Sequence, residues 1–498
     1  MKVFLGALWS GVLLALAHPK WDLGPLAFGA LLPWLFILAS TKERVFTSSF
    51  LVGFSYFLVL LYWLVPVMTT FGGLPWPAAL GTLGLLAAYL ALYFGACGYL
   101  ARYLGLLEAD AKGLFFFPAL FVALEFLRGK LFYGFPWGFV GATQYRFLPL
   151  IQVADLGGIY AVSYLVVLAN YLFFVSLKRK EGWGKTAFLG LLLFVSVLLY
   201  GFFRLGTVWP EGPFEKAALI QGNVPQELKW QPERRRQILA RYFSLSSRVL
   251  VRQPSLILWP ETALPFFFPL DSLSNEVLLW QKEHGVPLVL GAPRLGLRSQ
   301  KPLIHNSLFL VDDGRVISFY DKQHLVPFGE FIPLEEWFPF LRTFAVASGD
   351  YSPGPAGNPL LLGPGRVLGP LICFESVFPD LARRQVRQGA TLLLVATNDA
   401  WFNRSAGPYQ HFVQAVFRAV ENRRYLLRVA NTGISGLIDP WGRIKQATPL
   451  EETLTPCVEA HHLAYFSWYT RLGDLWAGFC VLITIFLLAE KLFRRGKK

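Results

Sequence analysis

The sequence predicts a multi-span α-helical membrane region joined to an α/β domain built as a layered sandwich of sheets and helices. Hydrophobic residues make up 54% of the 498 residues and charged residues only 16%, a balance typical of membrane proteins. Long apolar runs fill residues 1–205 and return near the end of the chain. Residues 206–470 instead have ordinary charge density and frequent Pro and Gly, and they are long enough to enclose a core. We therefore expect seven membrane helices in 1–205, a globular domain over 206–470, and a last membrane helix with a basic tail over 471–498.

The membrane helices are predicted from eight apolar runs, several of which reach or approach the roughly 20 residues that a bilayer requires. The runs are 3–17, 24–40, 46–67, 77–100, 114–127, 159–177, 186–204 and 474–490. Residues 1–17 also resemble a cleaved signal peptide, with a basic start and Ala15-Leu-Ala17 after the apolar run. We expect an uncleaved first span, because the number of the remaining spans is consistent with it.

The orientation of the spans follows from their flanking lysines and arginines. If the N-terminus is cytoplasmic, fourteen of these residues lie inside and six outside. The fourteen are Lys2, Lys42, Arg44, Arg102, Lys112, Lys178, Arg179, Lys180, Lys185, Lys491, Arg494, Arg495, Lys497 and Lys498. This positive-inside bias predicts that both termini are cytoplasmic and that residues 206–470 lie on the far side of the membrane. The inner positive residues less the five inner acidic residues give +9 of the total +14. The basic composition therefore reflects topology, and we expect no nucleic-acid partner.

Within residues 206–470, short apolar runs alternate with amphipathic segments, which predicts an α/β layered sandwich. Helices are expected at 231–253, 273–284, 377–388 and 408–423. Strands are expected at 217–221, 255–258, 287–291, 306–311, 316–320, 367–373, 391–396, 427–431 and 435–438. Asp312-Asp313-Gly314 and Asp439-Pro-Trp-Gly442 are turn signals that predict two hairpins.

Three reactive residues each follow a strand-like run. Glu261 comes after the run 256–260, Lys322 after 316–319, and Cys373 ends the run 369–373. Strand ends gather at one edge of a sheet, so these side chains can converge although they are far apart in sequence. A carboxylate, a lysine and a cysteine are the parts of an acyl-transfer site.

Each of the three has an expected role. A lysine that lowers the pKa of the Cys373 thiol from about 8.5 by two units would raise the thiolate fraction at pH 7 from about 3% to about 76%. Glu261 is expected to be the general base, enclosed and with a raised pKa. Lys322 is expected to hold the oxyanion with a backbone N–H after Cys373. Glu330 and Glu375 are expected to orient the lysine, with a structural or solvated ion pair as the alternative.

Other assignments of the reactive groups stay open. His305, His324 or His411 could pair with Cys373 as in papain-like enzymes, although nothing in the sequence positions them. Gly433-Ile-Ser435-Gly436 only partly matches a serine-hydrolase elbow. Cys373 and Cys457 could form a disulfide on the far side of the membrane. No metal-ligand spacing is present, since His461-His462 alone is weak, and we expect neither a metal nor another cofactor.

The local motifs extend well beyond the three reactive residues. They are Gln221-Gly-Asn223, Trp230, Trp259-Pro-Glu261-Thr, Lys322 with Val326-Pro-Phe-Gly-Glu330-Phe, Cys373-Phe-Glu375, and Asn398-Asp-Ala-Trp401-Phe. The order Glu261, Lys322, Cys373 resembles the triad of the nitrilase (carbon–nitrogen hydrolase) superfamily, whose fold is an α-β-β-α sandwich. Seven spans before such a domain and one after it resemble the apolipoprotein N-acyltransferase family of the bacterial envelope.

The resemblance implies a reaction in two halves at the bacterial cytoplasmic (inner) membrane. An acyl chain would pass from a phospholipid to Cys373 as a thioester, and then to the α-amine of a diacylglyceryl-cysteine on an apolipoprotein. A monomer suffices, because one chain holds every catalytic part. The main alternative is a membrane-tethered amidase that acts on a small amide with water as acceptor. A transporter is disfavoured, because Glu125 is the only acidic residue well inside one of the seven N-terminal spans.

Five further residues are candidates for substrate contacts. The motifs suggest Trp230, Phe374, Asn398 and Trp401; Phe374 stands where the family often has Tyr, so the sequence lacks a hydroxyl there. Arg128 could hold a lipid phosphate at the outer membrane face, with interface anchoring as the alternative. Two apolar loops, 264–269 and 337–341, could admit acyl chains or could pack within the domain.

Overall fold

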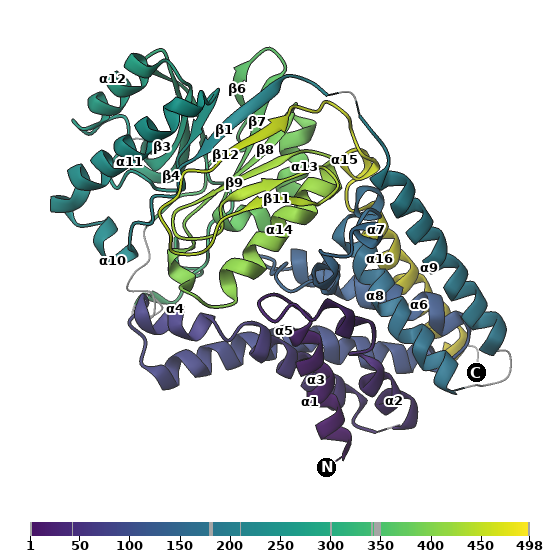
Figure 1. Ribbon diagram of the computed structural model, residues 1–498. Helices are drawn as coiled ribbons and strands as arrows, with labels where there is room; N and C mark the ends of the chain where they lie inside the picture. The colour runs from purple at the N-terminus through teal and green to yellow at the C-terminus, as the bar shows by residue number, and fades with distance from the viewer. Residues whose placement is uncertain are drawn as a thin grey trace. The chain divides into compact units, whose positions relative to one another are not determined.

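The computed structural model describes residues 2–41, 43–178, 183–209, 211–298, 301–339, 342 and 350–496. Several residues used above lie outside these ranges, namely Lys42, Arg179, Lys180, Phe340, Leu341, Lys497 and Lys498. The chain divides into two compact units (Figure 1). One, the helical unit, consists of Met1–Val65, Pro75–Thr207 and Ser467–Lys498. The other, the two-sheet unit, consists of Pro66–Leu74 and Val208–Phe466.

The helical unit has a helix in every predicted apolar run. Its main helices are α1 (Lys2–Leu16), α2 (Leu32–Ser40), α3 (Val45–Leu60), α5 (Trp76–Leu104), α6 (Ala111–Lys130), α8 (Ala154–Lys178), α9 (Trp183–Leu205) and α16 (Leu475–Gly496). Of the described helices, α5, α8, α9 and α16 are each long and apolar enough to cross a membrane. Helix α3 meets that test only together with α4 (Leu64–Thr70).

The predicted run 24–40 is not one helix. It is a short 3₁₀ turn, Gly24–Phe28, followed by α2. Pro33 lies in the first turn of α2, where its missing N–H costs nothing, and proline in a helix interior would remove a hydrogen bond. The helix therefore begins at Leu32 rather than running through from residue 24.

The two-sheet unit contains two six-stranded sheets. The first has the order β12-β1-β2-β3-β4-β5 and the second β11-β10-β9-β8-β7-β6. The strands of the first sheet are β1 (Phe214–Leu219), β2 (Leu256–Leu258), β3 (Leu288–Arg298), β4 (Lys301–Asp312), β5 (Arg315–Asp321) and β12 (Cys457–His461). Those of the second are β6 (Leu360–Gly363), β7 (Arg366–Ile372), β8 (Leu392–Thr397), β9 (Leu426–Ala430), β10 (Gly436–Ile438) and β11 (Ile444–Ala447).

Alternating side chains of the strands build two cores. In β1, Ala217 and Leu219 pack between the sheets, whereas Ala218 packs toward the outer helices. Helices α11 (Arg235–Val249) and α12 (Ser274–His284) contribute to the core on the outer face of the first sheet. Helices α13 (Pro379–Arg387) and α14 (Gly407–Asn422) contact strands β7 to β10 of the second sheet. The layers are therefore helix, sheet, sheet and helix (Figure 1), which confirms the predicted α-β-β-α sandwich.

The nine predicted strands and four predicted helices of this unit are present, and both predicted hairpins form. Strands β6, β11 and β12 were not predicted. Strand β11 lies at a sheet edge with all four residues exposed, and β12 carries a glutamate and a histidine. Edge strands need no apolar alternation, so their sequences give little signal.

The sheet topology places several strand ends at one edge. Strands β1, β2 and β3 are parallel to one another, and β5 has the same direction because two antiparallel steps separate it from β3. In the second sheet, β7, β8 and β9 are parallel. Parallel strands end at the same edge, so the residues after β2, β5, β7 and β8 can form one site.

Candidate active site

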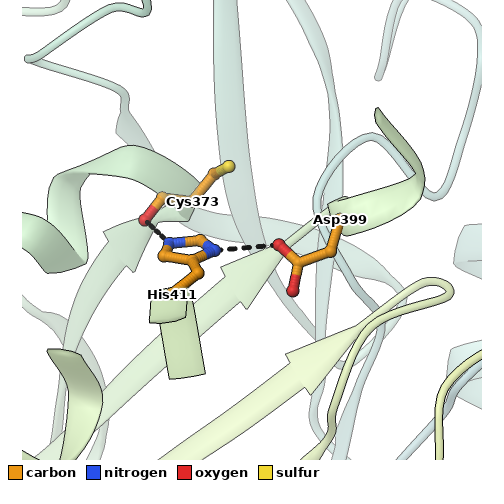
Figure 2. Close-up of side chains that lie close together, drawn as sticks. All are labelled: Cys373, Asp399 and His411. Atoms are coloured by element: carbon orange, nitrogen blue, oxygen red, sulfur yellow. Dashed lines mark hydrogen bonds and ion pairs between the residues drawn. The ribbon is translucent and has the colours of Figure 1, made fainter. Parts of the chain in front are cut away.

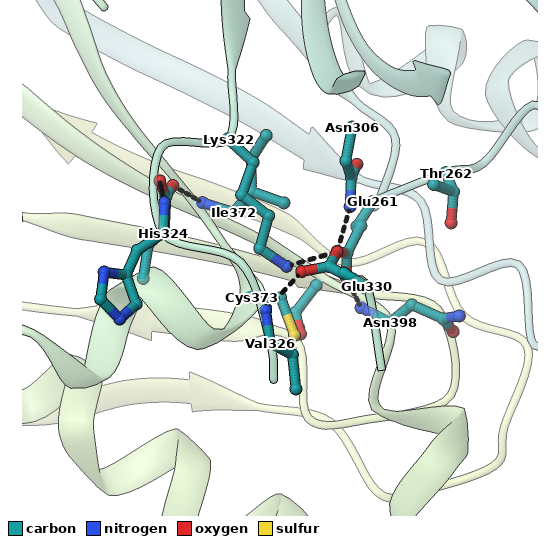
Figure 3. A network of polar contacts seen from close by, with 12 residues as sticks. Glu261, Thr262, Asn306, Lys322, His324, Val326, Glu330, Ile372, Cys373 and Asn398 are labelled. Carbon is teal, nitrogen blue, oxygen red and sulfur yellow. Dashed lines mark hydrogen bonds and ion pairs between the residues drawn. The ribbon is translucent and has the colours of Figure 1, made fainter. Parts of the chain in front are cut away.

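The three residues predicted to react lie together in the two-sheet unit (Figure 3). Glu261 follows β2, Lys322 follows β5, and Cys373 directly follows β7. All three are buried, with exposed fractions of 5%, 1% and 8%. Lys322 Nζ lies 3.3 Å from Glu261 Oε1, and the Cys373 thiol is within electrostatic range of both groups. The two sheets thus supply one side of the site each.

Glu261 has donors on both of its oxygens. Its Oε1 accepts from Asn306 Nδ2 at 2.7 Å and from Lys322 Nζ at 3.3 Å. Its Oε2 accepts from the Asn398 backbone N–H at 2.8 Å. Burial alone would raise the pKa of Glu261, but Lys322, Asn306, Lys229 and the Asn398 amide outweigh it and hold the pKa below its usual value. The residue is enclosed as predicted, whereas the predicted raised pKa is wrong, because these donors favour the charged form.

Lys322 lies between two carboxylates. Its Nζ donates to Glu330 Oε1 at 2.8 Å as well as to Glu261. Glu330 is fixed in turn by the Val326 N–H at 2.8 Å and by Asn306 Nδ2 at 3.0 Å. Burial alone would lower the pKa of Lys322, but Glu261 and Glu330 hold it well above its usual value. Lys322 is therefore a fixed cation, and the contact with Glu330 has the geometry expected of an orienting pair.

Cys373 occupies a turn that few residues adopt. Its φ is +53°, in the left-handed region that non-glycine residues rarely enter. Burial raises the pKa of its thiol, Glu261 raises it further, and Lys322 opposes this only in part. The expectation of a lowered thiol pKa is therefore wrong. The described arrangement is a neutral thiol beside an ionised carboxylate.

Glu375 contacts the backbone around Lys322 rather than its ammonium group. Its carboxylate accepts from the backbone N–H of Ile372 at 2.7 Å, of Gln323 at 2.6 Å and of His324 at 3.2 Å. The Tyr320 hydroxyl adds a fourth donor at 3.0 Å. Glu375 thus binds the loop after Lys322 to the turn before Cys373, and its contacts position the lysine through the backbone rather than through the ammonium group.

Lys229 is a second buried lysine at the site that sequence reasoning missed. It is 2% exposed, and its Nζ donates to Thr262 Oγ1 at 2.6 Å and to the Glu261 carbonyl at 3.3 Å. Thr262 has φ +45°, so Lys229 supports a turn that is otherwise unfavourable. Burial lowers the pKa of Lys229 to about 7, although Glu261 opposes the shift. Only its place beside Trp230 in the 221–230 motif region could have drawn attention to it.

A second polar cluster lies behind Cys373, and the sequence did not predict it (Figure 2). His411 Nε2 lies 3.0 Å from the Cys373 carbonyl oxygen, and its Nδ1 lies 2.9 Å from Asp399 Oδ1. Asp399 Oδ2 pairs with Arg428 Nη2 at 2.7 Å. The ligand atoms of Cys373, Asp399 and His411 all lie within 4.8 Å of one another, close enough for a metal ion. The imidazole and the carboxylate already bind each other, so these atoms have protein partners.

The other residues proposed as the nucleophile or as a partner of Cys373 have contacts elsewhere. His305 Nδ1 lies 2.8 Å from the Ser352 carbonyl oxygen. The His324 ring packs against that of Phe378 in a tilted arrangement, with ring centroids 3.8 Å apart. Ser435 is buried, and its hydroxyl donates to Gln221 Oε1 at 2.6 Å. Cys373 and Cys457 are both free cysteines. Among the residues considered, only His411 approaches Cys373, and it does so at the carbonyl.

The aromatic and amide candidates for substrate contact lie in varied settings. Trp230 is 44% exposed, which leaves its ring available. The Phe374 ring packs against Phe378, and that of Trp401 against Phe71. The Asn398 side chain is held by Gln226 at 2.8 Å and by Asn431 at 3.0 Å, so it contributes its backbone N–H to the site. Of these, Trp230 has the setting best suited to a substrate contact.

The two apolar loops differ. In the loop 264–269, Leu264, Phe266 and Phe268 are buried in the core on the outer face of the first sheet. These side chains therefore pack within the domain, which was the alternative to admitting acyl chains. In the loop 337–341, Trp337 is 79% exposed and Phe338 is 47% exposed. Of that loop, residues 337–339 are described. The first loop is therefore largely packed within the domain, with Phe267 39% exposed, and the described part of the second loop is the more exposed of the two.

Arg128 belongs to the helical unit and is buried, with 3% exposed. Its guanidinium donates to the carbonyl groups of Phe135 at 2.8 Å, Trp137 at 2.7 Å and Gly138 at 3.3 Å. The cavity beside it has a volume of about 20 Å³, enough for a water molecule but not for a lipid headgroup. These contacts favour a role in holding the loop 133–138 over a contact with a lipid phosphate.

The chain matches two family models in succession. Residues 10–172 match the apolipoprotein N-acyltransferase N-terminal domain, and residues 216–460 match carbon–nitrogen hydrolase. An apolipoprotein N-acyltransferase of Geobacter metallireducens is 41% identical, with 96% of this chain and 93% of that protein covered. One of Methylococcus capsulatus is 34% identical, with 91% and 89% covered. Among solved structures, yeast Nit3, a nitrilase-superfamily member, is 20% identical with a TM-score of 0.39, covering 51% of this chain and 93% of that one. The sequence relatives show that this chain belongs to the apolipoprotein N-acyltransferase family.

Proposed function

We propose that this chain transfers an acyl group from a phospholipid to the N-terminal amine of a diacylglyceryl-cysteine on an apolipoprotein, with Cys373 as the carrier. Membership of the family supports the reaction as a whole. The observation that carries the assignment of residues is the convergence of Cys373, Glu261 and Lys322 at the joined ends of two sheets. Glu330 supports the lysine, and one chain contains every part, so a monomer suffices.

In the first half-reaction, the Cys373 sulfur attacks the ester carbonyl carbon of the phospholipid. Glu261 takes the thiol proton as the S–C bond forms, because the thiol is neutral and the carboxylate is ionised. The negative charge then moves from Glu261 to the carbonyl oxygen, and Lys322 compensates it there. When the C–O bond breaks, Glu261 returns the proton to the oxygen of the departing lysophospholipid. The product is a Cys373 thioester.

In the second half-reaction, the amine nitrogen of the apolipoprotein attacks the thioester carbonyl carbon. Glu261 accepts a proton from the attacking amine, the N–C bond forms and the C–S bond breaks. The proton passes to the sulfur and restores the neutral thiol. Lys322 meets the same oxyanion in both halves, so one site serves two acceptors in turn.

The membrane setting is part of the proposal. We place both termini in the cytoplasm and the two-sheet unit on the outer side of the bacterial cytoplasmic membrane, on the strength of the charge distribution. Single cysteines at Ser272 and at Arg494, both exposed, test this in a background where Cys97, Cys373, Cys457 and Cys480 are all alanine. A membrane-impermeant maleimide applied to spheroplasts is expected to label position 272 and to leave position 494 unlabelled. The reverse pattern would overturn the orientation.

The carrier role is tested with purified, detergent-solubilised protein, a phospholipid and no acceptor. The intact mass is expected to rise by one fatty-acyl group, and neutral hydroxylamine is expected to remove it. Cys373→Ala is the matched control and is expected to show no adduct. Absence of the adduct from a wild-type protein with a free thiol would remove the lipid donor from the proposal, and release of ammonia from a soluble amide would then favour a hydrolase.

A further inference from the structure

The carbonyl oxygen of Cys373 is held by two side chains on the inner side of the turn. His411 Nε2 lies 3.0 Å from it, and Ser376 Oγ lies 2.9 Å from it. Ser376 Oγ also lies 3.0 Å from His411 Nε2. Because a carbonyl oxygen only accepts hydrogen bonds and the Ser376 hydroxyl donates to it, we assign a hydrogen to His411 Nε2, which then donates to the carbonyl. Figure 2 shows the carbonyl directed at the imidazole while the sulfur points away from it. His411 therefore contacts the backbone of the nucleophile and not its thiol.

His411 is itself tightly fixed. It is 1% exposed on α14, and Asp399 Oδ1 and Arg428 Nη2 lie 2.9 Å and 3.0 Å from its Nδ1. Although burial alone would raise the pKa of Asp399, Arg428 and His411 hold it well below its usual range. A side chain at Gly433 would collide with Asp399, since an added Cβ would lie 2.3 Å from Oδ2. The ring is thus held by a buried ion pair that has little freedom to move.

The direction of the carbonyl determines the direction of the next amide. The Cys373 carbonyl and the Phe374 N–H belong to one peptide unit, and in a planar trans peptide the two point in opposite directions. Phe374 is the second residue of the 3₁₀ helix Cys373–Val377, where N–H groups have no acceptor within the helix. With the carbonyl drawn inward to His411 and Ser376, the Phe374 N–H points to the opposite side of the turn.

We propose that His411, backed by Asp399 and Arg428, is a positioning residue that anchors the Cys373–Phe374 peptide and so directs the Phe374 N–H at the oxyanion. The inference rests on the proposed role of Cys373 as the nucleophile. Cys373 has a left-handed φ of +53°, which is easy for glycine but unfavourable for other residues. The peptide that follows it therefore needs an external anchor. Without the Nε2 donor, the peptide can rotate toward a more favourable conformation and withdraw the amide.

The test compares two reactions of the same thiol. Acylation by a small activated ester, such as p-nitrophenyl butyrate, passes through an oxyanion, whereas alkylation by iodoacetamide does not. His411→Leu removes the donor, and His411→Gln keeps an amide donor at a similar reach. Rates are measured from the mass of the Cys373-containing peptide in folded, detergent-solubilised protein, with Cys373→Ala as the blank.

In His411→Leu, ester acylation at saturating ester is expected to fall by on the order of 10²-fold, the effect of losing one oxyanion donor. Alkylation is expected to stay within about 3-fold, and His411→Gln is expected to recover most of the acylation rate. An equal fall of both reactions would overturn the inference, because His411 would then act on the thiol. Unchanged acylation would overturn it as well. The small ester makes this result independent of phospholipid as the natural donor.

If His411→Leu does not fold, Ser376→Ala removes the other donor to the same carbonyl and gives a second approach. Acylation is expected to fall while alkylation is retained, by less than in His411→Leu because the imidazole stays. A Ser376→Ala protein that loses both reactions equally, or neither, would contradict the proposed anchoring.

Discussion

The two polar clusters on either side of Cys373 use similar side chains in opposite arrangements. In the front cluster, one cation, Lys322, lies between two carboxylates, Glu261 and Glu330. In the back cluster, one carboxylate, Asp399, lies between His411 and Arg428. The front cluster faces the thiol and the back cluster faces the carbonyl of the same residue. In the proposed reaction, charge moves in the front cluster, whereas the charges of the back cluster stay fixed.

The largest expected effect comes from removing the shared cation of the front cluster. Lys322→Met leaves the buried carboxylate of Glu261 and the partly buried carboxylate of Glu330 close together without compensation. Removing one partner of a buried pair costs about 3–5 kcal/mol. We expect loss of acyl-enzyme formation together with a marked fall in the free energy of unfolding, measured by denaturant titration. Adding Glu330→Gln is expected to restore part of the stability and none of the activity. Recovery of activity in the double variant would contradict the role given to Lys322.

A direct comparison of the two clusters comes from matched carboxylate-to-amide changes. Glu261→Gln removes the proposed base and is expected to slow Cys373 acylation by about 10²- to 10⁴-fold. It is expected to lower the melting temperature less than Asp399→Asn does, because Glu330 still pairs with Lys322. Asp399→Asn leaves the base in place, so its main effect is expected to be on melting temperature, with acylation falling less. Rates come from single-turnover acylation and stability from thermal unfolding. The opposite ranking of the two variants would break the division between front and back.

A smaller effect concerns pH, and it is expected from Lys229, the buried lysine beside the front cluster. Burial lowers the pKa of Lys229 to about 7, against about 10.4 in an unfolded chain. Between these values the unfolded state binds more protons, so the stability of the folded state rises with pH. The wild type is therefore expected to gain stability relative to Lys229→Met as the pH is raised from about 7 to about 10. If the free energies of unfolding of the two proteins change with pH in parallel across this range, Lys229 is not neutralised by folding.

The smallest expected effect is at the residue that joins the clusters. Phe374 is proposed to act through its backbone N–H, while its ring packs against Phe378. Phe374→Tyr is thus expected to change the rate of either half-reaction by less than about 3-fold, measured as thioester formation and as transfer to an amine peptide. A larger change confined to transfer would assign the ring to recognition of the acceptor.

The sequence was informative where a proposed catalytic residue follows a strand. Glu261, Lys322 and Cys373 each follow a buried apolar run, so the strand pattern itself pointed to them. Lys229 and His411 were missed or left unplaced because helices carry them to the site from elsewhere in the chain. The pKa of Glu261 was predicted in the wrong direction because burial was weighed without the charge of Lys322 and without the hydrogen bonds from Asn306 and Asn398.

The fold was predicted nearly in full where packing imposes a pattern. Strands that lie between two layers are apolar and could be recognised, as in β2 and β8. The edge strand β11 is wholly exposed, and its sequence carries no such constraint. Breaks within an apolar run were also not predicted. The run 24–40 has the composition of one span, although its backbone forms two elements.

The bond from the Asn398 amide to Glu261 connects the ends of β8 and β2, which belong to different sheets. The proposed base therefore keeps its geometry only while the interface between the sheets is closed. Partial opening of the sandwich and loss of the base become one event, so a half-open domain would have no residual activity. The Asn398 amide is accordingly expected to be among the slowest in the domain to exchange its hydrogen with deuterated solvent, through the same opening that unfolds the core. In this architecture the competent fraction of enzyme molecules equals the fraction whose two sheets are fully docked.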